Sequence, residues 1–440
     1  MRKFWVGYWF KGWHFAYKIG FSIVITGART YYRNFMYLGK EKIPKNAGII
    51  YAINHQNAFL DPIAVAGQTN NPIHFLARSD IFKNKFAEKI LRQLYMLPIY
   101  RKRDGVDTIS KNQKTFEECH DILKNKGHLV IFPEGNHNFK KHLRSLKKGI
   151  SRIALGTLSR HGENTPLYIV PLGIDYENHF SMNADILLNV GEPIVVKKYY
   201  HEFINYNAET INKLTNKVSE LLKDLLLDIN DQENYEEIYY LLHRVPLKSK
   251  NIIEKFKERK NKLSNLKSLK NTDLKNYKKI ISDAKLLKSF VENHKIRAYL
   301  FSKPPMSLFK FYLTSFLMCL FLPFHLILLT TNYFPYKIPV WFVEKNIKDK
   351  HFHGSLKQAL GVILFIGYWS MILLLTLVFY GWKFFILSAI LLPIFAKINL
   401  KYWIQFIKLK GTWRFRKSLK HKNFNKAKEA FENIQKNLSL

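Results

Sequence analysis

The sequence predicts an α/β fold with a mainly parallel sheet flanked by helices, preceded by an N-terminal interfacial helical motif and followed by a C-terminal helical membrane region. Two observations predict it. Between about residues 46 and 200, short apolar runs alternate with amphipathic stretches, as in parallel strands joined by helices. After residue 305, apolar stretches long enough to cross a bilayer replace this alternation. The expected parts are 1–34 (membrane-interface helices), 35–200 (α/β domain), 201–305 (Lys-rich helices), 306–398 (transmembrane or re-entrant helices) and 399–440 (basic helical tail).

Strands and helices can be assigned to these runs. The expected strands are Gly48–Ile53, Ile73–Ala77, Leu97–Tyr100, His128–Phe132, Tyr168–Ile174 and Ile186–Val190, and the amphipathic stretches between some of them are 83–95, 107–126 and 147–160. In parallel sheets, ligands collect at the carboxyl ends of the strands. The chemically active residues should therefore follow the strands directly.

The composition indicates a polyanionic neighbour. The 440 residues include 70 Lys and Arg against 33 Asp and Glu, a formal net charge of +37. Nucleic acid, an anionic membrane surface or phosphorylated substrates would all fit. The aromatic share of 15% favours a membrane interface. The two cysteines, Cys119 and Cys319, form neither a disulfide framework nor a zinc pattern, which indicates a reducing, cytosolic compartment.

Both ends of the chain carry membrane signals. Residues 4–28 are apolar, with Trp5, Trp9 and Trp13 at helical spacing, which suits amphipathic helices in the headgroup region or an aromatic face packed on the protein. Phe309–Thr331 could span a bilayer, and Pro323 within it would allow a kink or re-entry. The stretch 358–396 suggests a hairpin of two short helices broken near Gly381.

Charge bias constrains the topology. Three full spans would put the basic tail opposite the α/β domain, so two spans or a re-entrant hairpin fit better, with that domain on the cytoplasmic face. The Lys-rich region 201–305 has Leu and Val at helical spacing, and we expect a solvated or membrane-facing helical linker there.

A His–Asp pair follows the first of these strands. His55 stands just after Gly48–Ile53, and Asp61 lies one short loop later, where it could cap a helix that starts with Pro62. A carboxylate bonded to one imidazole nitrogen leaves the other as a proton acceptor. The alternative is that Asp61 is only a cap and His55 a loop residue.

Three further blocks lie in or directly after later strands. Glu134 and Gly135, in the run Phe-Pro-Glu-Gly, could bind hydroxyl groups or only shape a turn. Arg144, Lys147 and Lys148 precede a helix and form either a phosphate site or a solvated charge run. The other two blocks are the strand that closes on Arg101, whose guanidinium suits a phosphate, and the apolar block Val170–Ile174.

In order and spacing, these four blocks resemble the glycerophospholipid acyltransferase family, which includes lysophosphatidic acid and glycerol-3-phosphate acyltransferases. The resemblance covers about residues 35–200 and implies that His55 is a general base oriented by Asp61. It also implies an acceptor site that contains Asn54, Arg101, Glu134 and Gly135, and cations for the acceptor phosphate at Arg144, Lys147 and Lys148.

The chain departs from the family pattern in two places. Five residues separate His55 from Asp61 where the family has four, and Asn136-His137-Asn138 stands where Thr-Arg-Ser is common. Both departures are similar to the fungal branch of glycerol-3-phosphate and dihydroxyacetone-phosphate acyltransferases, which also carries an additional membrane segment. The acceptor therefore stays open between glycerol-3-phosphate and lysophosphatidic acid.

The resemblance implies direct attack of an acceptor hydroxyl on acyl-CoA or acyl-ACP, with membrane lipids as partners. No cofactor and no metal are expected, although His137, His142 and Glu134, or His351 and His353, could be read as ligands. Two alternatives are a non-catalytic membrane protein that binds anionic lipid or nucleic acid through its basic surface, and a scaffold whose site is broken by the altered spacing. No nucleic acid is expected as a partner, because the basic residues are spread along the chain.

Overall fold

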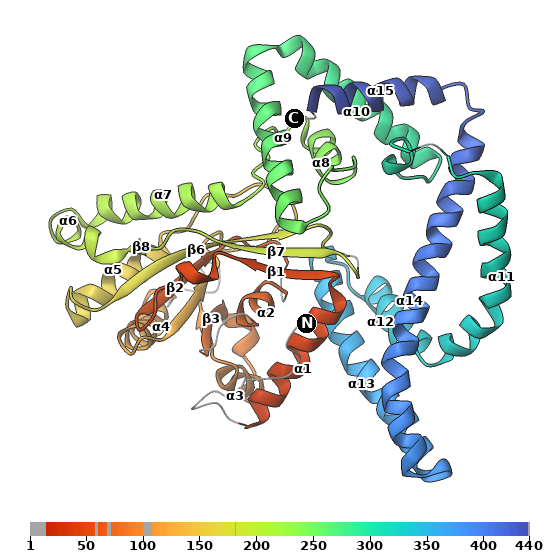
Figure 1. The fold of residues 1–440 in the computed structure, drawn as a ribbon. Coiled ribbons are helices and arrows are strands. Elements are labelled where there is room, and N and C mark those ends of the chain that lie inside the picture. The colour runs from red at the N-terminus through yellow and green to blue at the C-terminus, as the bar shows by residue number, and fades with distance from the viewer. Residues whose placement is uncertain are drawn as a thin grey trace. The chain divides into compact units, whose positions relative to one another are not determined.

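The computed structural model describes residues 15–57, 60–67, 72–100, 108–180, 182–303 and 305–438. The chain forms two compact units (Figure 1). The first contains residues 1–228 and 347–359, and the second contains residues 229–346 and 360–440. The expected Trp5, Trp9 and Trp13 face lies outside the described residues.

The first unit contains an eight-stranded sheet in the order β1-β7-β6-β2-β5-β3-β4, with β8 paired to β6. Its strands are β1 Asn34–Leu38, β2 Gly48–Ile53, β3 Ile73–Arg78, β4 Met96–Ile99, β5 His128–Ile131, β6 Leu167–Tyr176, β7 Asp185–Val190 and β8 Ile194–Val195. The β1–β7, β6–β2, β2–β5, β5–β3 and β3–β4 pairs are parallel, whereas β7 and β8 run antiparallel to β6. The predicted mainly parallel sheet is confirmed.

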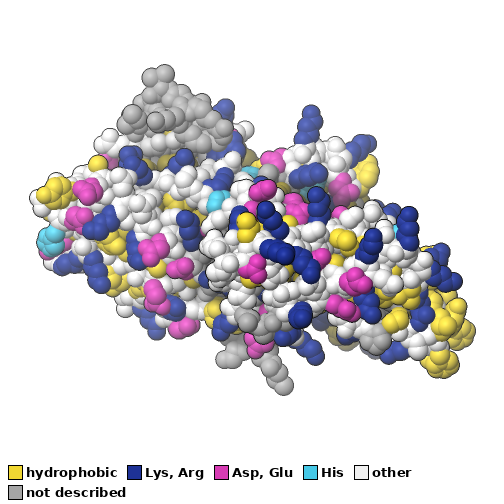
Figure 2. Space-filling view, turned by 90° about the horizontal axis from the view of Figure 1, so that it is seen from above, with side chains coloured by type: hydrophobic (Ala, Val, Ile, Leu, Met, Phe, Trp, Pro, Cys, Tyr) yellow, Lys and Arg dark blue, Asp and Glu magenta, His cyan; other side chains and the backbone are white. Residues whose placement is uncertain are grey.

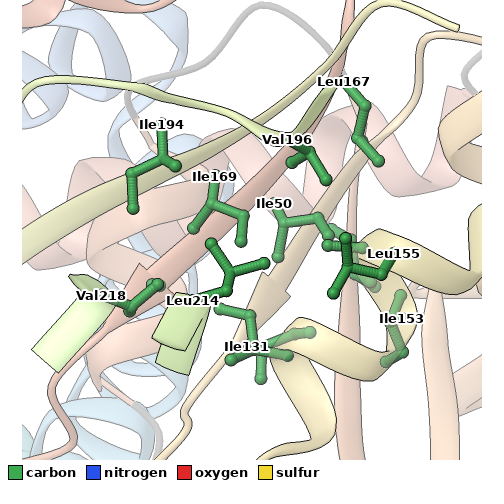
Figure 3. Close-up of a cluster of buried hydrophobic side chains, with 14 of the residues drawn as sticks. Ile50, Ile131, Ile153, Leu155, Leu167, Ile169, Ile194, Val196, Leu214 and Val218 are labelled. Atoms are coloured by element: carbon green, nitrogen blue, oxygen red, sulfur yellow. The ribbon is translucent and has the colours of Figure 1, made fainter. Parts of the chain in front are cut away.

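Strand β2 is apolar throughout because it is buried on both faces. Ile50 and Ala52 belong to a core on one face, and Ile49, Tyr51 and Ile53 belong to a core on the other. The first core joins the sheet to the helices α4 Thr108–Lys124, α5 Gly149–His161 and α7 Asn207–Leu225. In Figure 3, Leu214 and Val218 of α7 lie beside Ile169 and Ile131 of the sheet.

The remaining helices of this unit are α1 Phe15–Tyr31, α2 Leu60–Ala66, α3 Lys85–Gln93 and α6 Tyr200–Asn205. All the expected strands are present, and helices occupy the three expected amphipathic stretches. Strands β1 and β8 were not expected; β1 is an edge strand and β8 is very short, so neither carries a buried apolar run. The compact unit continues past residue 200, because Leu214, Val218 and Leu222 of α7 are fully buried against the sheet.

In the second unit, the Lys-rich region is not a bare linker, contrary to the expectation. Its helices are α8 Tyr235–His243, α9 Ile252–Thr272 and α10 Leu274–Asn293, and they share a buried core with α15 Phe424–Leu438. Side chains cap the helix starts: Asn251 accepts from the Ile253 N–H, and Asp273 accepts from the Asn276 N–H. The apolar spacing read from the sequence therefore marks a packed helical core.

In the described part of the chain, three helices are long and apolar enough to cross a membrane: α11 Leu308–Thr330, α13 His353–Tyr380 and α14 Trp382–Ser418. The expected break lies at Gly381, where φ is +82°, but the two flanking helices are long and not short. α11 stays helical through Pro323, and α12 Tyr333–Asn346 follows it.

Helix α11 runs antiparallel to the basic, C-terminal half of α14. The Arg416 guanidinium bonds to the Met306 carbonyl before the start of α11, and the Asn399 amide donates to the Leu328 carbonyl at 2.8 Å near its end. The final carbonyls of α11 also accept from α13, where the Tyr368 hydroxyl bonds to Thr330 at 2.9 Å. The Asn399 and Tyr368 side chains thereby satisfy carbonyl groups in the last turn of α11, which the helix end leaves without an intrahelical partner.

Basic side chains do not gather in one place on the visible face. Figure 2 shows Lys and Arg interleaved with Asp and Glu across it. This distribution on the visible face differs from the single basic stripe that a duplex-binding surface presents.

A buried histidine in β5 makes stability depend on pH. Burial lowers the pKa of His128 to about 4 from 6.5, and His74 adds to the effect. The folded chain thus binds this proton more weakly than the unfolded chain. The stability that neutral His128 contributes is complete above about pH 6.5 and falls as the pH approaches 4.

When the pH is lowered from about 7.5 to about 5.5, the free energy of unfolding should therefore fall by about 1 kcal/mol less in His128→Gln than in the wild type. Denaturant unfolding followed by circular dichroism at both pH values measures this. His201→Gln is the control, because the His201 side chain is 80% exposed. Equal acid sensitivity of His128→Gln and the wild type would contradict the prediction.

Candidate active site

Three parallel strands end at the same edge of the sheet and bring the expected motifs together. β6, β2 and β5 are neighbours. His55 follows β2, the Phe132–Gly135 block follows β5, and Tyr176 is the last residue of β6. The prediction that the site residues follow the strands is therefore confirmed for the described blocks. Arg101 lies outside the described residues.

His55 and Asp61 form a direct hydrogen bond, with 2.8 Å between Nδ1 and Oδ2. The Asp61 side chain is fully buried, and the His55 side chain is 14% exposed. An ionised carboxylate is only an acceptor, so the proton of a neutral imidazole belongs on Nδ1. Nε2 then carries the lone pair that can accept a proton.

Asp61 is held by more than His55. Its Oδ2 also accepts the backbone N–H groups of Gln56 and Asn57, each at 2.8 Å. Its Oδ1 accepts the Tyr176 hydroxyl at 2.6 Å. These donors compensate the burial of a charge and fix the direction in which the carboxylate faces His55.

The local backbone differs from the expectation that Asp61 caps a helix. α2 begins at Leu60, so Asp61 is its second residue and Pro62 its third. The carboxylate accepts N–H groups from the preceding loop and not from its own helix. The backbone at Gln56 and Asn57 thus folds back on the carboxylate.

Glu134, in the block that follows β5, connects that block to His55 after β2. Its Oε1 accepts the backbone N–H of His55 at 2.9 Å, and its Oε2 accepts the Arg144 Nε at 2.9 Å. Arg144 also donates to the Asn136 carbonyl. Gly135 has φ +72°, a backbone conformation that side chains disfavour. Glu134 and Arg144 therefore hold the turn that Gly135 makes possible.

Lys147 and Lys148 lie at the start of α5, which begins at Gly149 as expected. Both side chains are exposed. The Lys147 N–H donates to the Pro133 carbonyl at 2.7 Å, which holds this cation beside the Phe-Pro-Glu-Gly turn. The structure thus brings Lys147 next to Gly135, and Lys148 follows it.

Asn54 is 2% exposed, and its side chain is fully engaged with β6. Its amide donates to the Ile174 carbonyl at 3.1 Å and accepts the Ile174 N–H at 2.7 Å. In this structure Asn54 joins the ends of β2 and β6, which fixes where His55 emerges.

Two buried residues of the site were missed by the sequence analysis. Burial first, and the charge of Asp61 second, raise the pKa of Tyr176 well above its usual value, so its hydroxyl remains a donor. Lys141 is 1% exposed, forms an ion pair with Asp175 and donates to the Tyr176 carbonyl at 2.8 Å. One signal was available for Tyr176, since it follows the apolar block Val170–Ile174 at a strand end. No sequence signal distinguished Lys141, because lysines are frequent throughout this basic chain.

Aromatic rings surround the imidazole of His55. The Phe132 ring stacks on it with centroids 4.1 Å apart, and the His137 ring meets it edge-on at 5.4 Å. Within the described ranges there is no group of three His, Cys, Asp or Glu side chains arranged to hold a metal, and His142 instead faces Asp228 at 2.9 Å.

Asn54→Ala should destabilise the first unit by about 2 to 4 kcal/mol, because it leaves two buried backbone groups of Ile174 without their partner. The midpoint of denaturant unfolding measures this. Asn216→Ala, on the exposed side of α7, is the control and should stay within about 0.5 kcal/mol of the wild type. Equal midpoints for both variants would contradict the role assigned to Asn54.

The part of the chain that contains this site is similar to known acyltransferases. The sequence model of a family described as Acyltransferase matches residues 34–175. The chain is 33% identical over 112 residues to "Glycerol-3-phosphate O-acyltransferase 2" of Saccharomyces cerevisiae, a match that covers 25% of this chain and 15% of that protein. It is 28% identical over 117 residues to the "1-acyl-sn-glycerol-3-phosphate acyltransferase" of Bacillus subtilis, which covers 26% of this chain and 53% of that protein.

A solved structure is also similar. The crystal structure of the 1-acyl-sn-glycerophosphate (LPA) acyltransferase PlsC from Thermotoga maritima matches with a TM-score of 0.35 and 21% identity, over 47% of this chain and 78% of that chain. The matched segments thus span only part of these relatives. With the family model and the two sequence relatives, the resemblance read from the four motif blocks is confirmed for the α/β unit.

Proposed function

We propose that this chain transfers a fatty acyl group from acyl-CoA or acyl-ACP to a hydroxyl of a glycerol-phosphate acceptor, which is either glycerol-3-phosphate or lysophosphatidic acid. The observation that carries the proposal is the His55–Asp61 hydrogen bond at the carboxyl end of β2, in a domain of this family. His55 is the general base. Its Nε2 takes the proton of the acceptor hydroxyl as the new C–O bond forms, and the thiolate of the donor leaves.

The fixed geometry of Asp61 supports this role for His55. Because the carboxylate accepts from Nδ1, from two backbone N–H groups and from Tyr176, it cannot rotate away from the ring without breaking several bonds. It therefore keeps the imidazole in one tautomer and stabilises the imidazolium that forms during proton transfer.

The acceptor phosphate fits the cations near the second motif. Lys147 and Lys148 are exposed at the N-terminus of α5, where the helix dipole also favours an anion. Arg144, in contrast, bonds to Glu134 and to the Asn136 carbonyl. We assign phosphate binding to the two lysines. Arg144 and Glu134 hold the turn beside them, and Arg101 remains a proposed contact of the phosphate.

A membrane setting suits this chemistry, because the fatty chains of the product belong in a bilayer. Among the residues that the structure describes, three helices are long and apolar enough to cross one. We propose a membrane location with the α/β unit on the cytoplasmic face, where acyl-CoA and acyl-ACP are found.

His55→Ala should lower acyl transfer by about 10²- to 10⁴-fold, because the general base is removed. The assay uses full-length protein in detergent with a labelled acyl donor. Glycerol-3-phosphate and lysophosphatidic acid are offered separately, and the acceptor that gives labelled product identifies the substrate. Undiminished transfer by His55→Ala would refute the role of His55, and no transfer by the wild type to either acceptor would refute the proposed function.

Tyr176→Phe should lower kcat by about 10- to 100-fold, because a hydrogen bond to a charged group contributes about 1.5 to 3 kcal/mol. Steady-state kinetics over a range of acceptor concentrations measures kcat and KM separately. Tyr37→Phe is the control, since Tyr37 is a partly buried tyrosine whose buried hydroxyl bonds to no described residue. Equal kcat values for the two variants would show that Tyr176 does not position Asp61.

A further inference from the structure

A short segment from the C-terminal half of the chain joins the unit that contains the candidate active site. Residues 347–359 belong to the first compact unit, although the residues on both sides of them belong to the second. The segment contains a 3₁₀ helix, Lys350–Phe352, and the first turns of α13. Its residues Ser355 and Gln358 are 2% and 5% exposed. This part of an otherwise apolar helix is therefore packed against the α/β fold.

The contact is closest at Gly354. A Cβ atom added there would lie 2.3 Å from the carbonyl oxygen of His179 and 3.4 Å from Nδ2 of Asn57. Real Cβ atoms essentially never approach a backbone oxygen to 2.3 Å. Only glycine allows α13 to sit this close to these two residues.

Both residues beneath Gly354 are connected to Asp61. The Asn57 N–H donates directly to the Asp61 carboxylate at 2.8 Å, and the Asn57 side chain donates to the His179 carbonyl at 3.4 Å. The His179 ring bonds to the Gln56 side chain at 3.1 Å, and the Gln56 N–H also donates to Asp61. Gly354 thus packs against the loop whose Gln56 and Asn57 N–H groups donate to the Asp61 carboxylate.

A second contact lies on the His55 side of the same pair. The Phe352 ring meets the His137 ring edge-on with centroids 5.3 Å apart, and His137 meets His55 at 5.4 Å. The segment therefore reaches both members of the catalytic pair through one intermediate residue on each side.

We infer that residues 347–359 are part of the active site, and that Gly354 is a positioning residue that keeps the Gln56–Asn57 loop closed on Asp61. The inference rests on the proposed function, which it extends to the helix α13. Asn57, which follows His55 closely in the chain, contacts this helix at Gly354. The same helix is long and apolar enough to cross a membrane, so a candidate membrane helix takes part in shaping the site.

The test compares two Gly→Ala substitutions in one helix. Gly354→Ala places a Cβ against the loop, whereas a Cβ at Gly361 would meet nothing within 4 Å. Both changes replace Gly with Ala within α13. We expect kcat of Gly354→Ala to fall by about 10- to 100-fold with the acceptor KM within about twofold, since a small displacement of a catalytic group is costly. Gly361→Ala should behave as the wild type.

A second readout does not require turnover. Hydrogen exchange at the Gln56 and Asn57 amides, which donate to Asp61, should be faster in Gly354→Ala than in Gly361→Ala. If the wild type transfers no acyl group, the proposed function fails, and the exchange rates still decide whether Gly354 holds the loop. Equal kcat and equal exchange in the two variants would overturn the inference.

Phe352→Ala covers the case in which Gly354→Ala does not fold, because it removes a ring and adds no clash. We expect a lower kcat at unchanged acceptor KM, as the His137 ring beside His55 loses its support. A folded Phe352→Ala protein with wild-type kcat would contradict a role for this segment in positioning the pair.

Discussion

The candidate active site depends on one buried carboxylate. A charge removed from water must be matched by donors, and the Asp61 carboxylate has four: His55, two backbone N–H groups and the Tyr176 hydroxyl. These donors come from the loop that follows β2 and from the end of β6. The carboxylate thereby ties the ends of two strands to one loop, and the orientation of His55 follows from that arrangement.

The sequence was sufficient to predict most of the α/β fold. Strands β2, β5 and β6 are buried on both faces and read as continuous apolar runs, so their positions were visible without any tertiary information. The place of His55 after β2 followed directly from this. The contact between His55 and Asp61 could be expected as well, because the two residues are close in sequence.

The rest of the site depends on pairing between distant segments. Tyr176 reaches Asp61 only because β6 lies beside β2, and strand order cannot be read from a strand's own sequence. Lys141 resembles many other lysines until its ion pair with Asp175 is seen. Gly354 is one of several glycines in α13, and only its distance to the His179 carbonyl distinguishes it from Gly361.

The polar bonds between α11 and α14 limit how these helices can be embedded. The end of α11 meets Asn399, which is about 25 Å along α14 from Trp382 at 1.5 Å per residue. α11 then extends about 35 Å further along the same axis. Placed upright together, the two stretches would need a hydrocarbon slab of about 60 Å, twice the usual thickness of about 30 Å. The thickness of the hydrocarbon core thus favours a single hairpin made of α13 and the apolar half of α14. This hairpin returns the chain to the leaflet from which it entered. α11 is then accommodated by tilt or lies along that leaflet.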